Sequence, residues 1–261
     1  MIIDAGPPAT GNASYNAHAS TLAFELTSGR RPLIVSCGSG AHLGPDWHRA
    51  GRATPSHSTL CLGGYSSARL GKPVKTSGLF REFLVEAPKI VPVEMSQTAE
   101  GVKFEGAHSG YVPPFGLTHA RKLSLSLDGR SLVGEDLLIA LNDTTGKAAE
   151  TVLSEDIDPN VDFQIRFHLH PEVDAALDLG GTTVAIAAKS GEIWIFRHES
   201  NLFLTIEPGV YLEKNQPTPR ASRQIVLSGM VNDALTRAQW SLSKTQDTAM
   251  AIRDLRLEEL R

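Results

Sequence analysis

The fold is decided most clearly by residues 122–134, which read Lys122-Leu123-Ser124-Leu125-Ser126-Leu127-Asp128-Gly129-Arg130-Ser131-Leu132-Val133-Gly134. Apolar and polar side chains alternate along this stretch, and a period of two places the apolar side chains on one face of a β-strand. The Asp-Gly pair at its centre is a strong signal for a β-hairpin turn, because glycine readily adopts the left-handed backbone of tight turns. The stretch therefore predicts two antiparallel strands with one buried face.

The same pattern recurs along most of the chain. A second hairpin is predicted over residues 183–196, with Ser190-Gly191 at its turn. Further short strands are expected at 21–26, 32–38, 89–98, 101–105, 162–169, 202–207, 224–231 and 236–243. Short strands at regular spacing, separated by Gly, Pro, Asn or Asp, are typical of stacked antiparallel sheets. We predict an all-β fold, an antiparallel multi-stranded β-sandwich, forming one domain over residues 1–261.

Two segments depart from this pattern. Residues 247–261 read as a short C-terminal helix, with Asp247 as its cap and apolar side chains near one face. Residues 141–159 are polar and read as a long surface loop within the domain.

Composition excludes several classes of protein. The chain has 261 residues, 41% of them hydrophobic and 21% charged, as expected for a globular protein with a sizeable core. A formal net charge of -4 and the lack of a basic cluster argue against a nucleic-acid partner. The apolar runs are too short to span a membrane, so we expect no membrane partner. The two cysteines, Cys37 and Cys61, lie in apolar strands and are predicted to be buried free thiols.

Histidines supply the main candidates for chemistry, because the sequence has no Gly-rich phosphate loop, no Cys-x-x-Cys pair and no Gly-x-Ser-x-Gly elbow. His18 and His57 lie among small polar residues at strand entries rather than on an apolar face, which makes them the first candidates for a functional role. His168 and His170 share one face of a strand. That pair either binds a ligand or metal together, or forms an outward polar face, and we favour the outward face.

Other residues suit an acidic sugar polymer. Trp47 lies in a predicted loop at 44–48, where its ring is free to stack on a sugar. A local basic patch is expected from Arg49, Arg52 and Arg69.

Several motifs, taken in order, resemble the C-terminal β-sandwich of the heparinase II/III-like polysaccharide lyases. The first are Asn16-x-His18 before the strand at 21–26, then the strand at 32–38, then Arg52-x-Thr54-x-x-His57-x-Thr59. The resemblance continues through residues 106–111, 116–121, 134–136 and 166–171, and so covers nearly the whole chain. It implies a lyase that cleaves uronate-containing acidic polysaccharides by β-elimination. In that reaction a base removes the C5 proton beside the carboxylate and an acid assists the leaving C4 oxygen.

The resemblance also implies roles for individual residues. Asn16, His18 and His57 take the catalytic positions, although Asn16 stands where the family has an acid–base histidine. His18 and His57 match zinc ligands, but Ser36 stands at the position of the aspartate ligand, which leaves a tetrahedral zinc site short of a donor. Since the family brings these three positions to one site, and both histidines lie at strand ends, we predict that His18 and His57 come together with Ser36 near them at the open end of the sandwich. Substrate-binding candidates are Trp47, Arg49, Arg52 and His108.

Family members carry a helical α/α-toroid before the sandwich, with substrate in the cleft between the two. This sequence has no such helical part, so we expect the chain to be inactive alone and to need a toroid domain as its partner. The alternative is a non-catalytic carbohydrate-binding or assembly domain whose lyase chemistry and metal site have decayed. The sequence does not indicate a compartment or a particular glycan.

Overall fold

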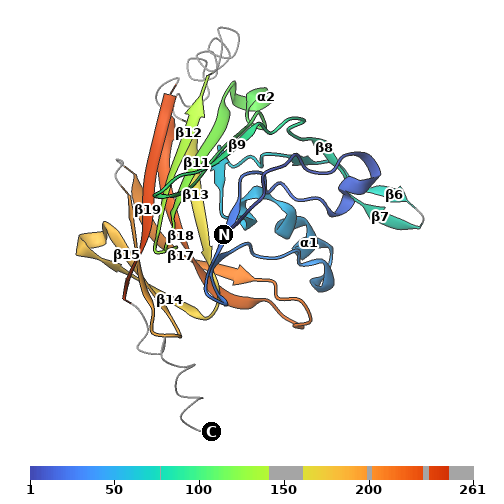
Figure 1. The fold of residues 1–261 in the computed structure, drawn as a ribbon. Helices are drawn as coiled ribbons and strands as arrows, with labels where there is room; N and C mark the ends of the chain where they lie inside the picture. The colour runs from blue at the N-terminus through green and yellow to red at the C-terminus, as the bar shows by residue number, and fades with distance from the viewer. Residues whose placement is uncertain (77, 141–160, 199–201, 232–234, 247–261) are drawn as a thin grey trace.

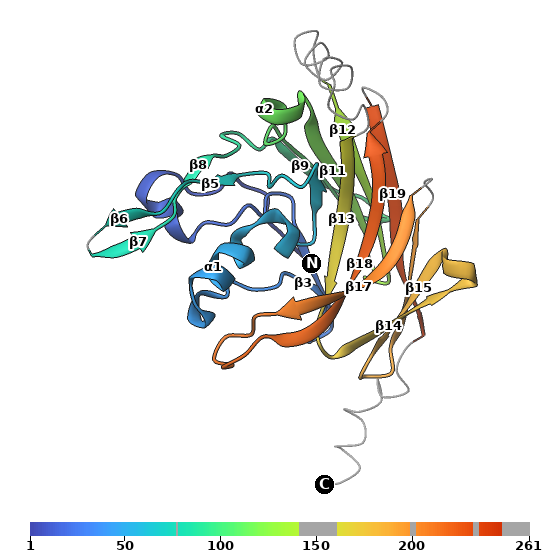
Figure 2. The same cartoon turned by 180° about the vertical axis from the view of Figure 1, so that it is seen from behind.

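The computed structural model describes residues 1–76, 78–140, 161–198, 202–231 and 235–246. Two large sheets pack around a shared apolar core, and every strand pairing among the described residues is antiparallel. Figures 1 and 2 show the arrangement from opposite sides. The prediction of an all-β antiparallel sandwich is confirmed.

The first sheet has seven strands, in the order β1-β2-β3-β13-β18-β17 with β4 also paired to β13. Its strands are β1 (Ile2–Ile3), β2 (Phe24–Ser28), β3 (Arg31–Val35), β4 (Leu60–Leu62), β13 (Val161–Leu169), β17 (Phe203–Tyr211) and β18 (Arg220–Val231).

The second sheet has eight strands, in the order β14-β15-β16-β19-β12-β11-β10-β9. Its strands are β9 (Val93–Gln97), β10 (Gly101–His108), β11 (Thr118–Ser126), β12 (Ser131–Ile139), β14 (Val173–Asp178), β15 (Thr183–Ala188), β16 (Ile193–His198) and β19 (Leu235–Gln246).

Smaller elements lie outside the two sheets. The two short hairpin-like pairs are β5 (Arg69–Leu70) with β8 (Leu84–Glu86), and β6 (Val74–Thr76) with β7 (Leu79–Arg81). The helices are α1 (Pro45–Arg52) and α2 (Val112–Phe115), with 3-10 turns η1 (Gly11–Asn16), η2 (Ala41–Leu43), η3 (Thr54–Ser56) and η4 (Leu179–Gly181). Among the described residues, no helix is long and apolar enough to cross a membrane.

Both predicted hairpins are present. β11 and β12 pair with Leu125 opposite Leu132, and Gly129 in their turn has a φ of 66°. Asp128 tightens that turn, because its Oδ1 accepts a hydrogen bond from the Arg130 amide at 3.0 Å. β15 and β16 form the second hairpin. The predicted C-terminal helix at 247–261 and the loop at 141–159 lie outside the described residues.

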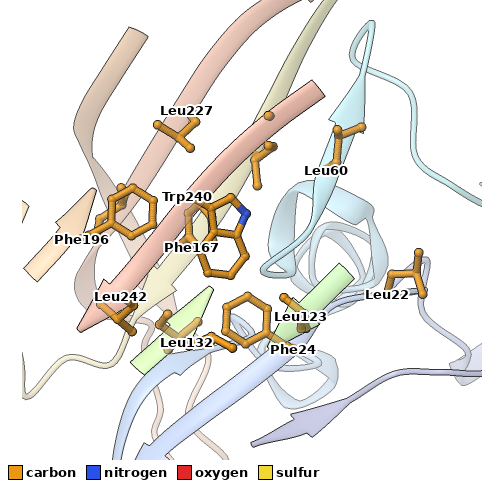
Figure 3. Packing of buried hydrophobic residues seen from close by; sticks show 14 of the residues in the cluster. Leu22, Phe24, Leu60, Leu123, Leu132, Phe167, Phe196, Leu227, Trp240 and Leu242 are labelled. Atoms are coloured by element: carbon orange, nitrogen blue, oxygen red, sulfur yellow. The ribbon is translucent and has the colours of Figure 1, made fainter. Parts of the chain in front are cut away.

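Aromatic rings join the two sheets at the centre of the core (Figure 3). The Phe24 ring from the first sheet stacks on the Trp240 indole of the second, with centroids 5.6 Å apart and planes 9° from parallel. The Phe167 ring meets Trp240 edge-on at 4.8 Å, and Phe196 stacks on the far side of the indole. Burying each of these side chains contributes about 1.5–3 kcal/mol to folding.

A third layer covers the outer side of β13. It is formed by residues 36–59, including α1, which lies beside the first sheet in Figure 2. His168 is therefore 3% exposed, and its Nε2 donates to the Pro55 carbonyl oxygen at 2.8 Å. The favoured interpretation of His168 as part of an outward polar face was wrong, because this layer covers the outer side of β13 at His168. Both cysteines are buried free thiols, as predicted.

Candidate functional site

The predicted histidine pair is assembled in the structure. His18 follows η1, His57 follows η3, and Ser36 follows β3. His18 Nδ1 and His57 Nε2 share a hydrogen bond at 3.2 Å, and His57 Nδ1 lies 3.1 Å from Ser36 Oγ. The prediction that these three residues come together is confirmed.

The Arg52-x-Thr54 motif explains how His18 reaches His57. Arg52 Nε donates to the Ala17 carbonyl at 2.8 Å, and Thr54 Oγ1 donates to the Ala19 carbonyl at 2.7 Å. These two bonds hold the residues on either side of His18. Since His57 lies three residues after Thr54, the same short segment fixes both imidazoles.

The pair opens into a pocket of about 520 Å³. Its polar lining includes His18, Ser36 and His57, together with the carboxylates of Asp4 and Glu25. Asp4 accepts a hydrogen bond from Ser20, and Glu25 Oε1 accepts one from the Ser36 amide at 3.0 Å. The pocket thus combines imidazole and hydroxyl groups with two acids, and it suits a neutral polar ligand group better than an isolated anion.

Both imidazoles are neutral at pH 7. Burial lowers the pKa of His57 to about 3, assisted by repulsion from His18 and His168. Burial also lowers the pKa of His18, and the nearby Arg52 guanidinium adds to that effect. Each ring therefore carries one proton and one lone pair, which is what a nitrogen-to-nitrogen hydrogen bond requires.

A zinc ion does not fit this donor set. Zinc in proteins takes four donors, usually imidazole, thiolate or carboxylate. Here two imidazoles meet a neutral serine hydroxyl, and both nearby carboxylates have hydrogen-bond partners of their own. Within the described ranges, no group of three His, Cys, Asp or Glu side chains is arranged to hold a metal.

The remaining catalytic candidate lies apart from the pocket. Asn16 ends η1 with an exposed side chain and is not among the residues that line the pocket. The Asn16 amide neither gains nor loses a proton near neutral pH, so this position contributes no acid or base.

The four substrate-binding candidates fall in different places. Trp47 lies in α1, not in the predicted loop, and is half-buried. Arg49 is exposed on the same helix and forms an ion pair with Glu82. Arg52 is 1% exposed and His108 is 1% exposed, so both act inside the protein and neither is free to contact a polymer. Substrate contact by Trp47 and Arg49 stays a prediction.

An arginine-rich groove runs beside α1. We call it the arginine groove and define it by Tyr15, Arg49, Tyr65, Arg69, Phe80 and Arg81, which line two adjoining pockets of about 460 Å³ each. The Arg81 guanidinium lies 4.6 Å from the Tyr15 ring centroid, and the Arg69 guanidinium lies 5.3 Å from that of Tyr65. Three acids, Asp46, Glu82 and Glu86, lie along or next to it. Arg52 links the groove to the histidine pocket, because it lines both groove pockets and its Nε donates to the carbonyl of Ala17, which lines the histidine pocket next to His18.

A buried polar network, which sequence reasoning missed, lies behind the histidine pair. Asp136 of β12 accepts hydrogen bonds from Arg121 of β11, from His119 and from the Trp240 indole. Arg121 and Asp136 are directly opposite each other in the β11–β12 register. The sequence did contain a signal for this network. Arg121 and Asp136 each occupy a position where the alternating pattern of β11 and β12 expects an apolar, inward-facing side chain, and a charge at such a position needs a buried partner.

Comparisons with known proteins agree with this architecture. The family model described as heparinase II/III-like, C-terminal, matches residues 1–246. A curated relative, FtsZ-localized protein C of Caulobacter vibrioides, is 30% identical over 252 residues, covering 94% of this chain and 41% of the relative.

Solved structures share the fold at lower identity. The heparan sulfate lyase HepC of Pedobacter heparinus aligns with a TM-score of 0.65 at 15% identity, covering 94% of this chain and 32% of the lyase. A heparinase III structure aligns with a TM-score of 0.62 at 12% identity, covering 95% of this chain and 36% of that protein. The chain therefore spans less than half the length of each of these relatives. It belongs to the heparinase II/III-like, C-terminal family.

Proposed function

We propose that this chain is the β-sandwich portion of a polysaccharide lyase that acts on uronate-containing acidic glycans, and that it is inactive alone. The observation that carries the proposal is the neutral His18–His57 pair, which opens into a pocket next to the arginine groove. Family membership supports the relation to polysaccharide lyases.

The histidine pair supplies part of the chemistry of β-elimination. His18 is the candidate base near pH 7, because its imidazole is neutral and both nitrogens of His57 already have hydrogen-bond partners. The charge that then develops beside the uronate carboxylate needs a cation or a hydrogen-bond donor nearby. Asp4 and Glu25 are acids and do not provide it. The stabilising group would come from a helical toroid domain, which is why we expect no activity from the chain alone.

The arginine groove supplies the affinity for an acidic polymer. Arg69 and Arg81 each lie against a tyrosine ring, so their guanidinium groups are held in place with little loss of side-chain freedom on binding. Guanidinium groups match carboxylates through paired hydrogen bonds, and tyrosine rings suit the apolar faces of sugars. Alternating charges and rings in one groove suit a uronate polymer.

The first experiment measures binding of a panel of uronate oligosaccharides to the purified chain. Arg81→Ala should weaken binding roughly fivefold, equivalent to about 1 kcal/mol for one lost charged contact. Lys103→Ala is the matched control, because it removes one positive charge from an exposed site on β10, outside the groove. Equal affinities for both variants and the unmodified chain would refute glycan binding in the groove.

The second experiment measures lyase activity by the absorbance of unsaturated uronate products. We expect no product from the chain alone. Robust product formation would show that the elimination machinery is complete here, and would contradict the assignment of missing groups to another domain.

A non-catalytic binding or assembly domain is the second candidate. It is favoured by Asn16 and Ser36 at positions where the resemblance expects histidine and aspartate, and by the 30% identity to a relative named for its localisation with FtsZ. Co-sedimentation of the chain with FtsZ polymers, together with no glycan binding by any member of the panel, would favour this candidate over the lyase.

A further inference from the structure

Arg121 touches the two chain segments that carry the histidine pair. Its Nη1 donates to the Leu22 carbonyl at 2.8 Å and to the Ser58 carbonyl at 2.9 Å. Leu22 lies four residues after His18, and Ser58 directly follows His57. We propose that Arg121, oriented by Asp136, is the positioning residue that holds His18 and His57 in hydrogen-bonding distance. The inference concerns the histidine pair of the proposed function, but it requires no bound glycan.

The backbone at Leu22 needs such support. Leu22 has a φ of 64°, a left-handed conformation that residues with a Cβ rarely adopt. Its amide donates to the Asp4 carbonyl at 2.8 Å, while its carbonyl accepts from Arg121. The turn that leads away from His18 is therefore fixed at both polar groups of one strained residue.

Ser58 connects the segment that carries His57 to the segment that carries Ser36. Its Oγ donates to the Val35 carbonyl at 2.9 Å, and Val35 directly precedes Ser36. The amide of His168 donates to the same Oγ at 3.0 Å. By holding the Ser58 carbonyl, Arg121 thus acts on the segment that fixes both His57 and the chain leading into Ser36.

Asp136 fixes the orientation of the guanidinium. Arg121 Nε donates to Oδ1 at 2.8 Å and Nη2 donates to Oδ2 at 3.1 Å, which is a bidentate pair. The remaining acceptor capacity is filled by His119 Nε2 at 2.7 Å and by Trp240 Nε1 at 3.0 Å. Since Asp136 is 1% exposed and Arg121 is fully buried, water does not compete for these bonds.

The proton positions in this network follow from its partners. The Gly110 amide donates to His108 Nδ1 at 3.1 Å, so neutral His108 carries its proton on Nε2 and donates to His119 Nδ1. His119 then carries its proton on Nε2 and donates to Asp136. The bonds from Gly110 through His108 and His119 all donate toward Asp136, and the Arg121 guanidinium donates to the same carboxylate from the other side. Asp136 is therefore held in place by the histidines, and it holds the guanidinium in turn.

The test uses nuclear magnetic resonance of the imidazole nitrogens. In the unmodified chain we expect a scalar coupling across the hydrogen bond between His18 and His57. Arg121→Lys keeps the charge beside Asp136, but a single ammonium group cannot reach Asp136 and both carbonyls. We expect the coupling to disappear and the pKa of His57 to rise by about one unit or more as its ring becomes hydrated. Trp240→Phe removes one donor to Asp136 while keeping an aromatic ring, so it should weaken the coupling less.

The control is Val184→Ala, which makes a cavity at a fully buried site on β15 but removes no hydrogen bond of the network. It should lower the melting temperature but keep the coupling and the pKa of His57. The proposal fails if Arg121→Lys retains the coupling, if Trp240→Phe weakens it more than Arg121→Lys does, or if Val184→Ala loses it. This measurement needs no ligand, so its outcome does not depend on whether the chain binds a glycan.

Discussion

Replacing Asp136 by asparagine should be among the most damaging single changes in the chain. The substitution keeps the shape of the side chain but removes its negative charge. Arg121 is fully buried against it, so the guanidinium would lose its counter-ion in a place that water does not reach. The new amide N–H group would also face Arg121, His119 and Trp240, all of which are donors and none of which can accept its hydrogen bond.

The expected loss in the free energy of unfolding follows from that burial. Removing one partner of a buried ion pair costs about 3–5 kcal/mol, because an uncompensated charge remains inside the protein. For a chain of this size each kcal/mol lowers the melting temperature by roughly 2–4 °C, so we expect a fall of about 6–20 °C. Burial by itself would raise the pKa of Asp136, but Arg121 and His119 outweigh it and hold that pKa well below its usual range. The carboxylate therefore stays charged, and the loss should be the same throughout the neutral pH range.

The assay is urea unfolding followed by tryptophan fluorescence, with calorimetry as an independent measure. Glu105→Gln is the control, since its carboxylate is 55% exposed and lies 3.5 Å from Lys122. Such a surface pair should contribute less than about 1 kcal/mol. Combining Arg121→Met with Asp136→Leu should not recover the lost stability, because it would leave His119 Nε2, Trp240 Nε1 and the Leu22 carbonyl oxygen without their hydrogen-bond partners inside the protein. If Asp136→Asn lowered the free energy of unfolding by less than about 1 kcal/mol, Arg121 and Asp136 could not form a buried ion pair from which water is excluded.

Three further predictions concern single residues. His57 takes up a proton near pH 6.5 when unfolded but only near pH 3 when folded, so the free energy of unfolding falls as pH drops below about 6.5. His57→Gln should reduce this pH dependence by about 1 kcal/mol per pH unit, measured by urea unfolding between about pH 5 and 6.5. Gly134→Ala would place a Cβ 2.1 Å from the Trp240 ring and should cost about 1–3 kcal/mol, whereas Gly6→Ala, with open space around it, should be neutral in the same assay. Burial raises the pKa of the Cys37 thiol to about 11, so iodoacetamide should label it in urea but not in the native chain, and rapid native labelling would contradict its burial.

The strands and hairpins were predictable because their signals are local. Alternating side chains and an Asp-Gly or Ser-Gly turn lie within about a dozen residues of each other, and the β11–β12 hairpin formed as expected. The meeting of His18 with His57 was also predictable, since small polar neighbours marked both as strand-end residues and the family resemblance brings their positions to one site. These inferences needed no knowledge of what packs on either sheet.

The rest depended on layers that a single sequence does not reveal. Arg52 and His108 were predicted to contact substrate, yet long-range packing buries both. His168 was assigned to an outward face by alternation, but that rule fails where a third layer covers the strand. Trp47 was placed in a loop because Gly44 and its neighbours are turn residues, and instead a proline begins a short helix there.

Arg121 binds carbonyl groups that are distant in the sequence, and this separation affects when the histidine pair can form during folding. The carbonyls of Leu22 and Ser58 lie 99 and 63 residues from Arg121 in the sequence. The chain must therefore close two long loops before the guanidinium can bind both groups. Closing long loops carries an entropy cost that grows with their length, and folds dominated by distant pairings assemble slowly, in milliseconds to seconds. A partly folded or newly synthesised chain would therefore present ordinary, separately titrating imidazoles. The paired, neutral form would appear only in the finished domain, so its resonance signature would mark the end of folding.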